Sequence, residues 1–203
     1  KVLSENDIAY SKGDHNKFLL EPASQGVPAV HEQTKAIYRF FDELKKRHPG
    51  LEIESCASGG GRIDLGMAVH ADRFWTSDCN DPVERQAIQR SFSLFFPPET
   101  MGTHVGPRAS HTTARDTGIG FRAWTAFFGH FGIEADLRAM TARERELLAQ
   151  VISLHKQHRA LLHAGRTLRL SHPDAGMTAM MVVGEAGALV SAAQVGTPET
   201  ATL

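Results

Sequence analysis

The chain has 203 residues, of which 41% are hydrophobic and 22% charged, the composition of a globular protein with a sizeable core. A formal net charge of -1 gives no electrostatic reason to expect nucleic acid or an acidic membrane surface as a partner. No apolar run approaches the ~18 residues of a membrane span, and the 11 histidines form no HExxH or comparable metal-binding pattern.

Only two cysteines are present, Cys56 and Cys79, and their spacing fits neither a zinc ribbon nor a CxxC redox pair. Two cysteines do not make a disulfide framework, which favours a reducing cytoplasm as the location. No signal peptide is visible. The chain starts at Lys1 rather than at methionine, so we expect an upstream part to be missing.

The first part of the chain predicts three strands, over residues 8–12, 51–56 and 73–77. Between the first two strands, apolar side chains at i, i+3, i+4 and i+7 predict a helix over residues 29–47. Basic residues suit the C-terminal end of this helix, and Pro49-Gly50 end it.

The middle of the chain continues the alternation. Asp81, Pro82 and Glu84 supply an N-cap, a first-turn proline and an acidic third position, which predict a helix that runs to the Pro97-Pro98 break. A fourth strand is expected over residues 101–105, a helix near residues 120–130, and a weak fifth strand over residues 131–133.

The last part begins with a capping box, Thr141 to Glu144, which opens a long helix that ends near Gly165. Beyond it, MTAMMVV, GEAG and ALVSAAQV predict a β-hairpin with no helix between its strands. We therefore expect two domains, over residues 1–168 and 169–203.

Five βα units imply an α/β fold with a parallel sheet and helices outside it. Two architectures compete: an open doubly wound sheet, and a (β/α)8 TIM barrel of which about five units remain. The reactive residues favour the barrel, because they fall at or just past the C-terminal ends of different strands, where barrel enzymes keep their sites. These residues are Asp14, Cys56, Asp78 and His104. Five strands cannot close a barrel, so this interpretation makes the chain a fragment.

Asp14 follows the first strand, and Lys12 lies two positions earlier on the same face. A nearby lysine favours the ionised carboxylate and lowers its pKa, as a nucleophile requires. The alternative is a solvated loop aspartate beside a surface lysine.

Asp78 follows the aromatic residues Phe74 and Trp75. Aromatic neighbours favour the protonated form of a strand-end carboxyl group, which suits a general acid. Asp81 is better explained as the helix cap, so Asp78 is the acid candidate.

The glycine-rich turn over residues 58–62 could hold a phosphate, but it is neither a Walker loop nor GxGxxG. Glycines also let a sugar approach the backbone closely. Cys56 lacks the local signature of a cysteine enzyme, which favours a small wall residue over a nucleophile. His104 and His111 are better explained as structural or substrate-contacting than as metal ligands. Several aromatic residues are most simply core: Phe92, Phe95, Phe96, Trp124, Phe127 and Phe128.

Taken together, several segments resemble the α-galactosidases of glycoside hydrolase family 36. The resemblance covers nearly the whole chain and rests on YSKGDHNK, ESCASGGGRIDLGM, FWTSDCNDPVERQAIQRSFSLFFPPE, MGTHVGP, FFGHFGIEADL and LHKQHRALLHAGR. It implies that the strands are the fourth to eighth of a (β/α)8 catalytic barrel. The final hairpin would begin a β-sandwich-like domain.

By position, the resemblance implies that Asp14 is the nucleophile and Asp78 the acid/base. It also implies substrate-binding roles for a further set: Lys12, Asn16, Cys56, Gly59 and Arg62. The chain departs from the family at two places. It has Lys12-Gly13-Asp14 where KWD is usual, and Lys17 where an arginine usually follows the asparagine. Gly13 removes an aromatic side chain beside the nucleophile.

The activity implied is retaining hydrolysis of α-galactosides such as melibiose or raffinose, without a metal or organic cofactor. The alternatives are an inactive or sugar-binding relative, and a member that transfers galactose or cleaves N-acetylgalactosaminides. The remaining alternative is a phosphate-binding protein with an open α/β sheet. We expect a homo-oligomer for the full-length protein, with no nucleic acid or membrane partner.

Overall fold

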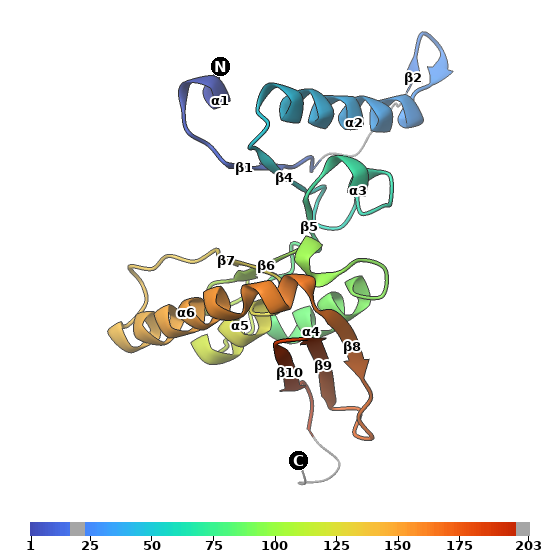
Figure 1. The fold of residues 1–203 in the computed structure, drawn as a ribbon. Helices are drawn as coiled ribbons and strands as arrows, with labels where there is room; N and C mark the ends of the chain where they lie inside the picture. Colours follow the sequence, from blue (N-terminus) through green and yellow to red (C-terminus); the bar gives the residue numbers. More distant parts are fainter. Residues whose placement is uncertain (17–22, 198–203) are drawn as a thin grey trace. The chain divides into compact units, whose positions relative to one another are not determined.

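The computed structural model describes residues 1–16 and 23–197. The chain divides into two compact units, Lys1–Asp78 and Cys79–Leu203 (Figure 1). Among the described residues, no helix is both long enough and apolar enough to cross a membrane.

The first unit contains three parallel strands and one long helix. Its elements are α1 (Val2–Glu5), β1 (Tyr10–Gly13), β2 (Ala23–Ser24), β3 (Val27–Pro28), α2 (Val30–Arg47), β4 (Glu52–Ser55), α3 (Met67–His70) and β5 (Arg73–Trp75). Strand β4 pairs in parallel with both β1 and β5. The three predicted strands and the helix are confirmed, with ends that differ by at most two residues. The β2–β3 pair and α3 were not predicted.

The register of these strands sorts their side chains onto two faces. Lys12 lies opposite Glu54, and Glu54 lies opposite Arg73, so these three share one face. The next residue of each strand, Gly13 on β1 among them, faces the other way. The ring of Phe41 on α2 lies directly against Gly13, so this second face is the one that α2 covers.

The second unit combines two parallel strands with an antiparallel sheet. Its elements are α4 (Pro82–Phe92), η1 (Pro98–Thr100), β6 (Met101–Val105), α5 (Ile119–Ala126), β7 (His130–Ile133), α6 (Ala142–Ala164), β8 (Arg166–Leu170), β9 (Met177–Gly184) and β10 (Gly187–Gln194). Strands β6 and β7 are parallel, whereas β8, β9 and β10 are antiparallel. The predicted hairpin is confirmed as β9 and β10. The domain boundary expected after residue 168 stays a prediction.

Both predicted helix caps of the second unit are present. Asp81 accepts a hydrogen bond from the backbone N–H of Val83 at 2.9 Å and caps α4. Thr141 and Glu144 form the reciprocal capping box that opens α6. These caps explain why the two helices begin where they do.

The core of the second unit lies between β6, α5, α6 and β9, where Val105, Phe127, Val151 and Val182 are buried. Two aromatic residues that were interpreted as core are instead exposed, Phe95 at 79% and Trp124 at 46%. For Phe95 the reason is local: α4 ends at Phe92, so the helical spacing no longer places residue 95 on the buried face.

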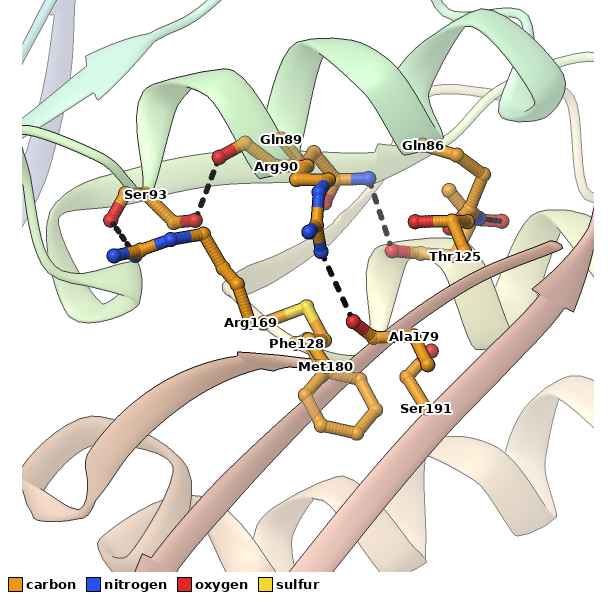
Figure 2. A pocket seen from close by; sticks show the side chains of 11 residues that line it. Gln86, Gln89, Arg90, Ser93, Thr125, Phe128, Arg169, Ala179, Met180 and Ser191 are labelled. Carbon is orange, nitrogen blue, oxygen red and sulfur yellow. Dashed lines mark hydrogen bonds between the residues drawn. The ribbon is translucent and has the colours of Figure 1, made fainter. Parts of the chain in front are cut away.

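A pocket lies where α4 and α5 meet the antiparallel sheet, and Figure 2 shows the polar side chains that line it. Arg90 donates to the carbonyl oxygen of Ala179 at 3.1 Å, and Arg169 donates to that of Ser93 at 2.6 Å. Because both guanidinium groups bond to the protein's own backbone, we interpret the pocket as the joint that docks the sheet onto α4.

Candidate active site

The predicted reactive residues of the first unit follow neighbouring parallel strands. Asp14 comes directly after β1, Cys56 directly after β4, and Asp78 three residues after β5. Since β4 pairs in parallel with both β1 and β5, their carboxyl ends meet at one edge of the sheet. The backbone hydrogen bond from Cys56 N–H to Gly13 O, 2.9 Å long, extends the pairing of β1 and β4 up to this edge.

Asp14 lies among groups that favour its ionised form. Partial burial works against ionisation, but hydrogen bonds from the Cys56 thiol, from Asn16 and from the backbone of His15 outweigh it. The charge of Lys12 acts in the same direction, so the pKa of Asp14 lies below its ordinary value. The Asn16 bond joins its Nδ2 to Asp14 Oδ2 at 3.0 Å. Asp14 therefore has the ionised carboxylate that a nucleophile requires.

Cys56 is completely buried and acts as a neutral hydrogen-bond donor. Burial, together with the hydrogen bond that the thiol donates to Asp14, raises the pKa of the thiol to about 11; the backbone of Gly59 hydrogen-bonds to the same thiol. A thiol with so high a pKa is a poor nucleophile at neutral pH. The geometry thus supports the interpretation of Cys56 as a wall residue.

Asn16 ties the segment after Asp14 to the glycine-rich turn. Its Oδ1 accepts a hydrogen bond from the backbone N–H of Ser58 at 2.9 Å. Ser58 and Gly59 both have left-handed backbone conformations, with φ of 49° and 76°. A Cβ on Gly59 would lie 2.7 Å from the backbone nitrogen of Asp78. Gly59 therefore lets the turn pack directly against the backbone of the predicted acid/base.

Trp75 is a site residue whose polar role the sequence did not predict. Its indole N–H donates to Asp78 Oδ1 at 3.0 Å, and Lys12 Nζ lies 4.6 Å from the centre of its ring. From the sequence, Trp75 is only an apolar neighbour of Asp78. The available signal was that a buried tryptophan usually finds a partner for its N–H.

Gly13, where the chain departs from the family pattern, faces away from Lys12. A Cβ at this position would lie 2.8 Å from Cζ of Phe41 on α2. The aromatic ring of Phe41 therefore occupies space that a side chain at residue 13 would need. The other departure, Lys17, lies outside the described residues.

The remaining predicted residues have supporting positions. Arg62 Nη1 donates to the carbonyl oxygen of Cys56 at 3.3 Å, which braces the glycine-rich turn against the end of β4. His104 lies on β6, with its Nδ1 3.1 Å from Glu134 Oε2, and His111 lies exposed in the loop that follows. Within residues 1–16 and 23–197, no cluster of three or more His, Cys, Asp or Glu is placed to hold a metal ion.

Comparison with known proteins places this geometry in a family. The family model described as Melibiase matches residues 1–165. Over 182 residues the chain is 44% identical to an α-galactosidase of Escherichia coli. The alignment covers 90% of this chain and 26% of that protein.

Solved structures give the same result. The structure matches the crystal structure of the GH36 α-galactosidase AgaA from Geobacillus stearothermophilus with a TM-score of 0.88 at 34% identity, over 94% of this chain and 28% of that one. Variants of AgaA have been solved in complex with raffinose and with stachyose. The likeness confirms the predicted fold, part of a (β/α)8 barrel followed by the start of an all-β domain. The chain spans about a quarter of the length of these relatives.

Proposed function

Because the chain belongs to the melibiase family of GH36 α-galactosidases, we propose that the complete protein hydrolyses terminal α-D-galactosyl residues. The substrates we propose are galacto-oligosaccharides of the raffinose or melibiose type. Support for this class comes from AgaA, variants of which bind raffinose and stachyose.

We propose a retaining mechanism carried by Asp14 and Asp78. The Asp14 carboxylate attacks the anomeric carbon while Asp78 protonates the glycosidic oxygen, which leaves with the rest of the oligosaccharide. A covalent galactosyl ester on Asp14 results. Asp78, now ionised, takes a proton from water, and the hydroxide formed displaces Asp14 and releases galactose. The two carboxylates and water complete the reaction, which needs no metal or organic cofactor.

The observation that carries the proposal is the environment of Asp14. Hydrogen bonds from Cys56, Asn16 and the His15 backbone keep a carboxylate ionised at the strand edge where barrel enzymes keep their sites. Asp78 lies after β5, the strand next to β4, and is oriented by the indole of Trp75. One carboxylate is thus prepared to attack, and a second one is held in a defined orientation.

Assays on the complete protein test this function. We expect turnover of p-nitrophenyl α-galactoside and of raffinose, with an α-configured product at early times by NMR. Asp14→Ala should abolish this turnover. Galactose binding without turnover would instead favour the inactive sugar-binding relative. Preference for an N-acetylgalactosaminide, or transfer to a sugar acceptor, would favour the other family activities. A cytoplasmic location and a homo-oligomeric state remain parts of the proposal.

A further inference from the structure

We propose that Asn80, His104 and Glu134 form an anchor that positions the segment carrying Asp78. The anchor is a set of positioning residues, and it rests on the proposed function, in which Asp78 is the acid/base. All three residues belong to the second unit. Asn80 is two residues beyond Asp78 in the sequence, whereas His104 lies on β6 and Glu134 directly follows β7.

One carboxylate oxygen joins the three side chains. Asn80 Nδ2 donates to Glu134 Oε2 at 2.9 Å, and His104 Nδ1 lies 3.1 Å from the same oxygen. Hydrogen bonds to a charged carboxylate are stronger than those between neutral groups. The backbone of Glu134 is itself fixed, because its N–H donates to Val105 O at 3.0 Å and prolongs the pairing of β6 with β7. The end of a rigid strand pair thus holds Asn80.

Two glycines make room for this arrangement. A Cβ on Gly132 would lie 2.5 Å from Cδ2 of His104, whose ring lies across β7 at the paired position. A Cβ on Gly106 would lie 3.2 Å from the side chain of Asn80. Larger residues at either position would displace the anchor.

The choice of asparagine is hard to explain by stability alone. Asn80 is 5% exposed, and its Oδ1 has no hydrogen-bond partner among the described residues. A buried carbonyl oxygen without a partner costs free energy, which an apolar side chain of similar shape would avoid. A 180° flip of the Asn80 amide would not supply the missing hydrogen bond, because Oδ1 would then lie against the Glu134 carboxylate. The residue is explained if its task is to hold the chain beside Asp78.

The anchor limits where Asp78 can lie. Only Cys79 separates Asp78 from Asn80, and Asp81 on the other side is fixed as the cap of α4. Asp81 also accepts hydrogen bonds from Thr113 and Arg115. Consecutive Cα atoms are about 3.8 Å apart, so the Cα atom of Asp78 can lie at most about 7.6 Å from that of Asn80. A misplacement of about 1 Å at a reacting group can reduce the rate about 100-fold.

The test introduces a second carboxylate into the anchor of the complete protein. Asn80→Asp keeps the shape of the side chain but places its carboxylate next to that of Glu134, and the two repel each other. We expect kcat on raffinose to fall about 10- to 100-fold with KM changed less than about threefold. Glu134→Gln can still accept from Asn80, although without the charge, and should therefore lose less kcat than Asn80→Asp. Adding Glu134→Gln to Asn80→Asp restores a donor and an acceptor, and should recover most of kcat.

Hydrogen–deuterium exchange of the peptide over residues 76–82 gives a second readout that does not need activity. This peptide should exchange faster in Asn80→Asp than in wild type, and its exchange rate should return to the wild-type value in the double variant. Unchanged kcat and exchange in Asn80→Asp, or no recovery in the double variant, would overturn the anchor. A wild type without turnover would refute the proposed function instead, and the exchange data alone would then decide on the anchor.

Discussion

The thiol of Cys56 donates a hydrogen bond to the carboxylate of Asp14, and so links the ends of two neighbouring parallel strands. The hydrogen bond between the Gly59 backbone and the same thiol fixes its orientation. The side chain at residue 56 therefore helps to set the charge state of the predicted nucleophile, beside any contact it makes with a sugar.

Loss of this hydrogen bond should shift the pH dependence of the reaction. The bond helps to hold the pKa of Asp14 below its ordinary value, so its removal in Cys56→Ala raises that pKa. Asp14 must be ionised to attack, and the acid limb of kcat/KM should therefore move to higher pH. Cys56→Ser keeps a donor and should move the limb less. An unshifted acid limb in Cys56→Ala would argue against this link.

Replacement of the acid/base should depend on the leaving group. Asp78→Asn cannot protonate the glycosidic oxygen, so we expect turnover of raffinose to fall about 10²- to 10⁴-fold. With p-nitrophenyl α-galactoside, the rate of the first step, in which p-nitrophenolate leaves, should fall less, because this leaving group needs no proton. Pre-steady-state bursts on both substrates measure the difference. Equal losses in the first step would remove Asp78 from the acid role.

Gly59 should tolerate no side chain. Alanine at φ 76° costs about 1–2 kcal/mol of backbone strain, and its Cβ would lie 2.7 Å from the backbone of Asp78. We expect Gly59→Ala to lower the thermal midpoint and also to reduce kcat about tenfold or more. Gly26→Ala is the matched control, since Gly26 has φ 77° but no atom of the described residues lies within 4 Å of its would-be Cβ. It should lower stability alone. A normal kcat in Gly59→Ala would contradict the role of this close packing.

Gly13 should matter for packing rather than for catalysis. Its Cβ would meet the ring of Phe41 at 2.8 Å, so Gly13→Ala should destabilise the protein by about 1 kcal/mol. A smaller residue in Phe41→Leu should relieve part of this cost in the double variant, as a double-mutant cycle of thermal unfolding would show. Gly50→Ala, with open space at its Cβ, serves as the control. A kcat for Gly13→Ala far below wild type would contradict this and would indicate that residue 13 faces the sugar.

Local chemistry made the secondary structure predictable. Asp81 and the Thr141–Glu144 box mark helix starts by side chains that bond to neighbouring backbone, and both caps are present. The strands before Asp14 and Asp78 were predicted from short apolar runs with polar ends. Features that depend on residues far apart in the sequence could not be predicted in this way. The helix α3 and the strand β8 were not predicted, and Phe95 was wrongly assigned to the core.

The sequence by itself determined the order of the longer helices and of the parallel strands, the family, and the two candidate carboxylates, because each depends on residue types at short spacings. Only the tertiary structure decided which groups act on those carboxylates. The contact of Cys56 with Asp14 and that of Phe41 with Gly13 span 42 and 28 positions of the chain. The parallel pairing of strands and the packing of α2 bring such residues together, and no local pattern records that pairing.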